Sequence, residues 1–378
     1  MTPKKILIVA GEPSGDLHAS NLVKDLKTLR PNLTFFGIGG VLSKKAGVDI
    51  VFDITPLALV GVVEVLKNIF TVGRAYKDIL RKVDSENPDL AILVDYPGFN
   101  LRLAKALKKR SIPVIYYISP QVWAWGRDRI NIIKRRVKKI LVFFKFEEEL
   151  YKTYGIDAEF VGHPLLDTVK TTLPKDEILK TYGLSKGKPV IALLPGSRTS
   201  ELKTLLPAML AGARIIDRKL GGVQFIIAKY RGLPRDLYEN LIKNMKLDVR
   251  IAEGDTYNIL GASDFAIVAS GTATLETAMI GTPLIIVYKA HPITYLLYKI
   301  VSDIKFLGIV NIIAGKEVVP EILQYEMTPD HIAARVVGLM RDEAGLSAMR
   351  DELGRVKSSL GSPGASLRAA RSILPFLQ

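Results

Sequence analysis

Residues 4–16 read KKILIVAGEPSGD, and this stretch decides the fold. The run Ile6–Ala10 is continuously apolar, which is typical of a parallel strand that is buried on both faces. The polar turn Gly11–Asp16 follows directly, and a helical pattern begins near Leu17. A strand that passes through a glycine-containing turn into a helix is the start of a βαβ unit. The sequence therefore predicts an α/β fold with a mostly parallel sheet.

The same alternation continues along the chain. Amphipathic stretches such as Leu101–Arg110 separate many of the later apolar runs. Up to Gly162, the further predicted strands are Phe35–Ile38, Ile50–Phe52, Leu90–Val94, Val114–Ile118, Ile140–Phe144 and Glu159–Val161. After a polar connector at 170–188, the predicted strands are Val190–Leu194, Phe225–Ala228, Val249–Ile251, Phe265–Ala269 and Leu284–Tyr288. We therefore expect two doubly wound, Rossmann-like domains at 1–165 and 166–343, with terminal helices at 344–378 that pack back on the first.

Composition limits the possible functions. The chain has 378 residues, of which 48% are hydrophobic, so disorder throughout is excluded. Lys+Arg 53 against Asp+Glu 38 gives a net charge of +15, which favours an anionic partner such as nucleic acid, a phosphorylated substrate or anionic lipid. The absence of cysteine excludes disulfides, thiolate metal sites and cysteine nucleophiles. With only four histidines as well, we expect no metal and no cofactor.

The sequence shows no targeting or membrane-spanning segment. The first apolar run is short and ends in a turn with Gly, Glu and Asp, unlike a signal peptide. The longest uncharged stretch, 277–288, is much shorter than the roughly 20 residues that span a bilayer. A cytoplasmic protein is expected.

Two loops of the first domain follow predicted strands, where doubly wound sheets bind ligands. In Gly11–Asp16 the glycine spacing differs from G-x-G-x-x-G and Glu12 would repel a pyrophosphate, so a dinucleotide site is disfavoured. The loop is either a turn with Asp16 as helix cap or part of a polar sugar or acyl-chain pocket. Asp95 follows an aliphatic strand, so its carboxylate is either a partly desolvated general base or a turn residue.

Two loops of the second domain have the composition of phosphate sites. Leu194–Arg198 reads LPGSR, in which Arg198 can bind a phosphate with two parallel hydrogen bonds. Ala269–Glu276 reads ASGTATLE, whose small residues allow a diphosphate to approach a helix amino terminus. Glu276 could accept hydrogen bonds from ribose hydroxyls. A capping motif built on Ser270 or Thr272 with Glu276 is the alternative, and both can hold together.

Two further segments suggest contact with anionic or apolar partners. Arg127–Lys139 has seven basic residues and follows Trp123 and Trp125, a combination that suits nucleic acid or a phosphorylated lipid surface, unless it is simply a solvated helix face. Leu57–Val72 is broadly apolar, which suits a helix at a lipid surface or, alternatively, a core helix.

Eight motifs, in order, resemble those of the lipid-A-disaccharide synthase family over nearly the whole chain. They are GEPSGD at Gly11, GVVEVL at Gly61, DYPGFN at Asp95, SPQVWAW at Ser119, GHPLLD at Gly162, LPGSR at Leu194, SGTATLE at Ser270 and NIIAGKEVVPEILQ at Asn311. The resemblance implies the GT-B architecture, with two Rossmann-like domains facing a central cleft and a carboxy-terminal helix that crosses back to the first domain.

The resemblance also implies a reaction and a location. UDP-2,3-diacylglucosamine and 2,3-diacylglucosamine 1-phosphate would condense, with inversion, to the β-1,6 disaccharide 1-phosphate and UDP in lipid A biosynthesis. We expect peripheral contact with the cytoplasmic face of an anionic membrane through Leu57–Val72 and Arg127–Lys139, and no nucleic-acid partner. The oligomeric state is left open.

Site residues carry over from the resemblance by position. Asp95 would be the base that takes the proton of the acceptor hydroxyl. UDP would be held by Gly196, Ser197, Arg198, Ser270, Gly271, Thr272, Glu276 and Asn311. The first-domain side of the cleft would be shaped by Glu12, Ser14, Asp16 and His18.

Two positions depart from the family pattern. Pro13 stands where the family commonly has Ala, and Gly98 where it commonly has an acid, so a two-carboxylate mechanism in this loop is put in doubt. The alternatives are a UDP-sugar 2-epimerase of the same fold, for which no early G-T-R-P-E signature is present, and a non-enzymatic binder of anionic lipid or nucleic acid.

Overall fold

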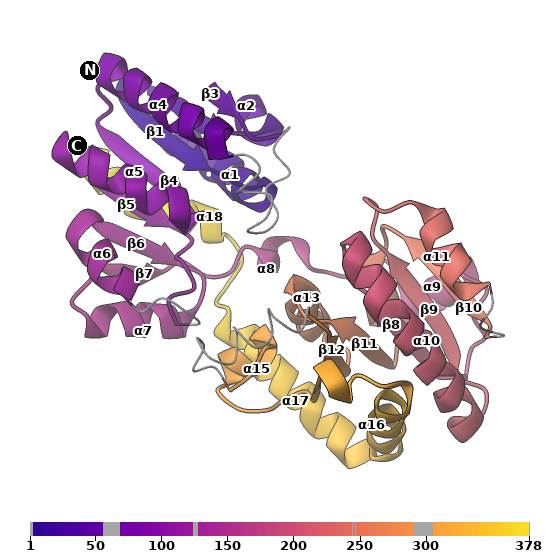
Figure 1. Ribbon diagram of the computed structural model, residues 1–378. Helices are drawn as coiled ribbons and strands as arrows, with labels where there is room; N and C mark the ends of the chain where they lie inside the picture. The colour runs from indigo at the N-terminus through magenta and orange to yellow at the C-terminus, as the bar shows by residue number, and fades with distance from the viewer. Residues whose placement is uncertain are drawn as a thin grey trace. The chain divides into compact units, whose positions relative to one another are not determined.

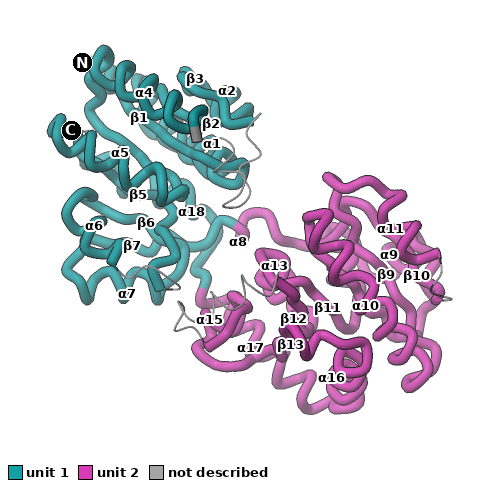
Figure 2. Tube along the Cα trace, in the orientation of Figure 1, with its two compact units in different colours: residues 1–164, 360–378 teal, residues 165–359 magenta. Residues whose placement is uncertain are grey.

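The computed structural model describes residues 3–55, 69–123, 128–243, 245, 247–290 and 305–377. It divides into two compact units, shown in different colours in Figure 2. Unit 1 contains residues 1–164 and 360–378, and unit 2 contains residues 165–359.

Unit 1 is built on a parallel sheet of seven strands within the described residues, in the order β3-β2-β1-β4-β5-β6-β7. The strands are β1 (Lys4–Ala10), β2 (Leu33–Gly39), β3 (Val48–Asp53), β4 (Leu90–Val94), β5 (Val114–Tyr117), β6 (Lys139–Val142) and β7 (Ala158–Phe160). The helices are α1 (Pro13–Leu29), α2 (Val41–Lys45), α4 (Ile69–Glu86), α5 (Pro97–Lys109), α6 (Asp128–Arg136), α7 (Lys145–Thr153) and α18 (Ala365–Ile373).

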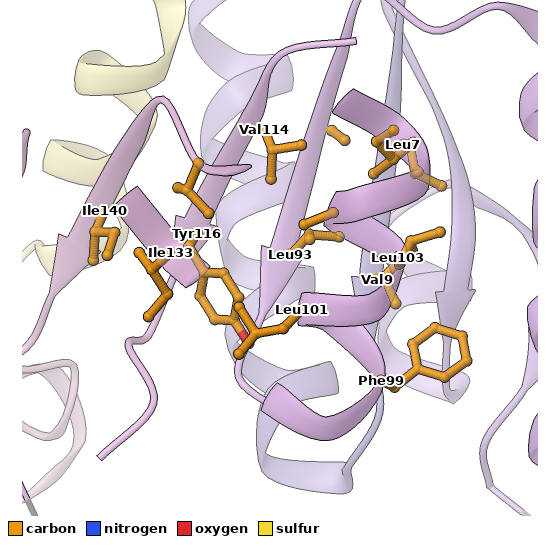
Figure 3. Packing of buried hydrophobic residues seen from close by; sticks show 14 of the residues in the cluster. Leu7, Val9, Leu93, Phe99, Leu101, Leu103, Val114, Tyr116, Ile133 and Ile140 are labelled. Atoms are coloured by element: carbon orange, nitrogen blue, oxygen red, sulfur yellow. The ribbon is translucent and has the colours of Figure 1, made fainter. Parts of the chain in front are cut away.

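Helices cover both faces of this sheet, and the alternation of side chains along β1 shows why its strands are apolar throughout. Leu7 and Val9 join the core beneath α4, α5, α6 and α7, part of which is drawn in Figure 3. Ile6 and Ile8 point to the opposite face, where they join the core beneath α1 and α18. Because successive strand residues face opposite sides, a strand covered on both faces must be apolar at every position.

Unit 2 has a second parallel sheet, in the order β10-β9-β8-β11-β12-β13 within the described residues (Figure 1). Its strands are β8 (Val190–Leu194), β9 (Gln224–Lys229), β10 (Val249–Glu253), β11 (Phe265–Ala269), β12 (Leu284–Tyr288) and β13 (Glu321–Leu323). Its helices are α8 (Leu165–Thr168), α9 (Lys175–Thr181), α10 (Thr199–Leu220), α11 (Arg235–Ile242), α12 (Thr256–Ala262), α13 (Thr272–Ile280), α15 (Ile309–Ala314), α16 (Pro329–Arg341) and α17 (Glu343–Ser359).

Every strand predicted from the sequence corresponds to a strand of the structure, within a few residues at the ends. β13 was not predicted, because three residues are too short to show a periodicity. The expectation that all of 344–378 packs on the first domain is wrong for α17, which belongs to unit 2, where it contacts α13, α15 and α16. Only the segment after Leu360 lies in unit 1, where α18 packs against α1. Within the described residues, no helix is long and apolar enough to cross a bilayer.

Candidate active site

Both sheets reverse their strand order at one point, and the predicted site loops lie at those two points. In unit 1 the order reverses between β1 and β4, and in unit 2 between β8 and β11. Two neighbouring strands whose connections run in opposite directions leave a crevice beyond their carboxyl ends, which is where open α/β sheets bind ligands. The GEPSGD and DYPGFN loops follow β1 and β4, and the LPGSR and SGTATLE loops follow β8 and β11.

The two loops of unit 1 are in direct contact. Ala10 pairs with Val94 at the ends of β1 and β4, so Gly11 and Asp95 begin their loops side by side. A Cβ atom added to Gly11 would lie 2.2 Å from Cδ1 of Tyr96, so only glycine leaves room for this ring. The sequence motifs are therefore two halves of one structural site.

Asp95 is held in an unusual backbone conformation. Both Asp95 and Tyr96 are left-handed, with φ of 46° and 47°, a region that non-glycine residues seldom adopt. Two side chains secure the turn through the carbonyl oxygen of Asp95: Nδ2 of Asn100 donates at 2.8 Å and the hydroxyl of Tyr116 at 2.6 Å. Burial raises the pKa of the Asp95 carboxyl, opposed by a backbone hydrogen bond from Tyr96. A raised pKa at the end of a buried strand is what a general base requires.

The other predicted residues of unit 1 do not all point into this site. Glu12 precedes the first turn of α1 and lies close enough to Tyr96 to contribute to the raised pKa of its hydroxyl, after burial. Ser14 is exposed, and His18 is half-buried against Phe143, with ring centroids 5.4 Å apart. Burial lowers the pKa of His18 to about 4, so this imidazole is neutral at pH 7.

Asp16 bonds within the protein. Its carboxylate is only 5% exposed and accepts hydrogen bonds from the backbone N–H groups of Gly40, Leu42 and Ser43 at 2.8, 3.0 and 3.1 Å. It therefore caps the amino terminus of α2. Its part in shaping the cleft stays a prediction. The sequence also allowed Asp16 to be a helix cap. Asp16 does cap a helix, but that helix is α2, whereas Asp16 itself belongs to α1.

Glu147 is a buried acid that the sequence analysis missed. It lies in the first turn of α7, and Oε1 accepts hydrogen bonds from Oγ of Ser119 at 2.9 Å and Nε1 of Trp123 at 3.1 Å. Burial raises its pKa to about 7, against the lowering effect of these bonds. Glu147 therefore fixes the SPQVW segment beyond β5, at the same edge of the sheet as Asp95. In the sequence it is followed by Glu148 and Glu149, and three consecutive acidic residues are typical of a solvent-exposed run.

Unit 2 contains a cavity of about 370 Å³ at its reversal point. Seven of the eight residues predicted to bind UDP line it: Gly196, Ser197, Arg198, Ser270, Gly271, Thr272 and Glu276. The other lining residues are Leu194, Glu201, Ala228, Tyr230, Thr256, Ala269 and Ala273. A neighbouring cavity of about 500 Å³ shares Tyr230, Thr256 and Glu276 with the first and extends over the ends of β9 and β10. The two predicted loops therefore form one binding region.

The amino terminus of α13 points into this region. Gly271 precedes the helix with φ 151°, and no side chain of the described residues caps this helix start. The backbone N–H of Thr274 donates to the carbonyl of Gly271 at 3.1 Å, so the amides of Thr272 and Ala273, before it, are the helix-start donors next to the cavity. Glu276, one turn later, lines both cavities, and Oε1 accepts a hydrogen bond from the hydroxyl of Tyr257 at 2.8 Å. Burial raises the pKa of Glu276, and the bond from Tyr257 opposes that rise.

In the LPGSR loop, the carboxylate of Glu201 accepts hydrogen bonds from the groups that were expected to bind a phosphate. Oε2 of Glu201 accepts the backbone N–H groups of Ser197 and Arg198 at 3.1 and 3.3 Å, and Oε1 lies 3.0 Å from a guanidinium nitrogen of Arg198. This carboxylate ties the loop to the start of α10. An anionic ligand at Arg198 would meet a guanidinium that is already paired with Glu201, on a side chain that is 58% exposed.

Asn311 differs in position from the other residues predicted to bind UDP. It is fully buried, does not line either cavity, and uses its whole hydrogen-bonding capacity within the protein. Nδ2 donates to the carbonyl of Val319 and to Glu321, and Oδ1 accepts the N–H groups of Val318 and Val319, all at 2.7 to 3.0 Å. Asn311 therefore holds the loop that leads into β13. The described residues include no group of three or more histidine or acidic side chains that could hold a metal ion.

The two segments expected at a membrane are only partly described. Leu57–Asn68 and Trp125–Arg127 lie outside the described residues. Phe70, near the start of α4, is 90% exposed. The basic end of α6 lines a cavity of about 380 Å³ with Lys108 and Lys138, at the amino-terminal edge of β5 and thus opposite the Asp95 edge.

The fold defines a class of protein: two-domain α/β proteins of the GT-B type, each domain a Rossmann-like parallel sheet. Solved structures agree on the fold. The glycotransferase of kitacinnamycin superposes with a TM-score of 0.64 at 13% identity, covering 100% of both chains. The UDP-GlcNAc 2-epimerase of Neisseria meningitidis, bound to UDP-GlcNAc, superposes with a TM-score of 0.57 at 11% identity, covering 99% of both.

Comparison with known sequences identifies one family over nearly the whole chain. A model of the lipid-A-disaccharide synthetase family matches residues 6–362. The lipid-A-disaccharide synthase of Syntrophus aciditrophicus is 44% identical over 100% of this chain and 99% of its own, and that of Geobacter sulfurreducens is 41% identical over 100% and 98%. The chain belongs to the lipid-A-disaccharide synthase family of glycosyltransferases, which act in lipid A biosynthesis.

Proposed function

We propose that the protein joins UDP-2,3-diacylglucosamine to 2,3-diacylglucosamine 1-phosphate with inversion, forming the β-1,6 disaccharide 1-phosphate and releasing UDP. Unit 2 binds the donor and unit 1 supplies the base and the acceptor site. The observation that carries the proposal is the cavity between β8 and β11, where the small residues before α13, the Arg198 loop and Glu276 converge. Membership of the family supplies the substrate class.

The donor side follows from the geometry of α13. The first-turn amides and the helix dipole stabilise an anion at the amino terminus, which suits the diphosphate of UDP. Gly271 has no atom within 4 Å of the position of a Cβ, so its backbone is open to close approach from the cavity. Glu276 accepts ribose hydroxyls in the part of the cavity that continues over β9. As the bond from the anomeric carbon to the diphosphate breaks, the same dipole and Arg198 stabilise the departing charge.

The acceptor side centres on Asp95. The carboxylate removes the proton of the acceptor hydroxyl as its oxygen bonds to the anomeric carbon from the face opposite UDP. One bond forms and one breaks, the proton remains on Asp95, and the bond electrons leave with UDP. The left-handed turn held by Asn100 and Tyr116 fixes the direction of the carboxylate, which limits the geometric freedom of this step.

The diacylated substrates require access to a lipid surface. We propose peripheral attachment to the cytoplasmic face of the membrane through Leu57–Val72, with Arg127–Lys139 supplying positive charge. Phe70, in the described part of the first segment, is 90% exposed and is therefore accessible to such a surface.

The test is product formation by Asp95→Asn. Wild-type protein should release UDP only when both acylated sugars are present, and the variant should lose turnover by about 10²- to 10⁴-fold because the amide cannot take a proton. Since burial raises the pKa of Asp95, kcat/KM of the wild type should fall as pH drops through a value above the ordinary carboxyl range.

Asp84→Asn is the matched control, because Asp84 pairs with Arg110 on the surface. Full activity of Asp95→Asn would remove Asp95 from the mechanism. Isomerisation of unacylated UDP-N-acetylglucosamine, without transfer, would replace the proposed reaction by an epimerase.

A further inference from the structure

We infer that Tyr257 is a positioning residue for nucleotide binding, acting through Glu276. This inference rests on the proposed function of the unit 2 cavity. Tyr257 is the second residue of α12 and Glu276 lies in α13, so the contact joins two helices that follow different strands. The hydroxyl of Tyr257 donates to Oε1 of Glu276 at 2.8 Å, and both residues line the larger cavity.

The hydrogen bond restricts how Glu276 can meet a ligand. A carboxylate on a helix surface can rotate freely, and each ligand hydroxyl then has to order it at an entropic cost. With Oε1 held by Tyr257, rotation of the carboxylate is restricted, and Oε2 with the remaining lone pairs is left for a ligand in the cavity that Glu276 lines. Two vicinal hydroxyls of a ribose match a carboxylate presented in this way, since both are donors to the same acceptor group.

The same hydrogen bond helps to keep Glu276 ionised, so that it can accept hydrogen bonds from a ligand. Burial raises the pKa of this carboxyl, and a protonated acid would offer one oxygen as a donor in place of an acceptor. The bond from Tyr257 opposes that rise, because a hydroxyl donor stabilises the ionised form. Tyr257 therefore serves orientation and ionisation together.

Tyr257 is itself held by its neighbours on α12. Asn258, the next residue, accepts the N–H groups of Thr172 and Leu173 at 2.7 and 3.1 Å through Oδ1. Its Nδ2 donates to Asp255 at 2.7 Å, just before the helix. These bonds tie the first turn of α12 to the segment that enters unit 2. The backbone that carries Tyr257 is thus fixed by contacts within the protein, which is the condition for a supporting residue to transmit a fixed geometry.

The test is a double-mutant cycle on UDP binding by the full-length protein. We expect Tyr257→Phe to weaken UDP binding by roughly tenfold, the size expected for loss of a hydrogen bond to a charged group. Glu276→Gln should weaken it at least as much. In the combined variant, Tyr257→Phe should add almost nothing, because its effect passes through the carboxylate.

A pH profile separates positioning from packing. Without the hydroxyl, the pKa of Glu276 should rise further, so UDP affinity of Tyr257→Phe should begin to fall at a higher pH than that of the wild type as the buffer is acidified. In turnover assays the KM for the donor should rise while kcat and the KM for the acceptor stay near wild type. Tyr76→Phe is the matched control: its hydroxyl donates to the carbonyl of Arg102 at 3.4 Å in unit 1, and Tyr76 lines neither cavity, so the pH profile of this variant should equal that of the wild type.

Three results would overturn the inference: wild-type UDP affinity in Tyr257→Phe, additive losses in the cycle, or an unshifted pH profile. If Tyr257→Phe lowers the Tm strongly, fluorotyrosine at position 257 gives the test, since it keeps the ring and strengthens the donor, and UDP should bind more tightly. UDP binding without any transfer of the acylated sugars would refute the proposed reaction and leave the positioning role intact.

Discussion

Gly11 shows how a single residue connects the loops that follow β1 and β4 in unit 1. Its sequence context suggests only a tight turn, but its structural partner is the ring of Tyr96, 85 residues later in the chain. Tyr96 and Asp95 share the left-handed turn, so the space at Gly11 and the direction of the Asp95 carboxylate are coupled. The turn could be read from the sequence, whereas the coupling required the structure.

Gly11→Ala should therefore impair catalysis more than folding. A Cβ at 2.2 Å from Tyr96 Cδ1 forces the ring and its strained turn to move, and a displacement of about 1 Å at a reacting group costs roughly 10²-fold in rate. Steady-state kinetics and thermal unfolding would measure the two effects. Gly98→Ala is the control in the neighbouring loop, because its Cβ would meet no atom within 4 Å. Equal activity of the two variants would contradict the coupling.

At the scale of elements, aromatic and histidine side chains from three segments pack together in unit 1. His18 of α1 contacts Phe143 after β6, and Phe143 contacts His163, with ring centroids 5.4 and 5.3 Å apart. Burial lowers the pKa of His18 to about 4, and burial followed by the charge of His18 lowers that of His163 to about 3. The sequence shows three isolated motifs here, and only packing reveals their common environment.

These histidines should make unit 1 sensitive to acid. In the unfolded chain these histidines bind protons below about pH 6.5, whereas in folded unit 1 they stay neutral. The free energy of unfolding should therefore fall from pH 6.5 toward pH 4, where the folded His18 also titrates. Both tryptophans belong to unit 1, so tryptophan fluorescence during urea unfolding reports on this unit alone. His18→Phe keeps a ring against Phe143 and should flatten the acid dependence; an unchanged slope would show that other groups cause it.

At the scale of the whole molecule, the chain leaves unit 1 at residue 164 and returns to it at residue 360. The returning segment completes the core: Ala369, Ala370, Ile373 and Leu377 are fully buried beside α1. Nε of Arg368 also donates to the carbonyl of Val161 at 2.8 Å. Unit 1 thus depends on residues at both ends of the chain, whereas unit 2 is continuous in sequence.

A chain that ends at Ser359 should lose unit 1 and keep the nucleotide site. Burial of Ile373 and Leu377 alone is worth about 3–6 kcal/mol, a large part of the 5–15 kcal/mol by which a domain is stable. Tryptophan fluorescence should show unit 1 unfolded or unfolding at much lower urea, while calorimetry should still detect UDP binding, since every residue of the cavity lies in 165–359. A wild-type fluorescence transition would show that the return segment is dispensable.

The sequence by itself determined the two parallel sheets, the loops that follow their strands, and the family. These properties are local: buried strands must be apolar on both faces, and ligand loops directly follow strand ends. Asp95 and seven of the eight residues predicted for the donor site lie at the two points where strand order reverses, as expected for loops that follow strand ends.

Only the tertiary structure decided what the polar groups bond to. Asp16 caps α2, Asn311 bonds a buried loop, Glu201 accepts the LPGSR amides, and Tyr257 donates to Glu276. The tertiary structure also showed that α17 belongs to unit 2 and α18 to unit 1, although both were predicted as helices of one terminal segment. The physical reason is the same in each case: a buried polar group must find a partner, and that partner is set by the packing of separate elements, which local periodicity does not encode.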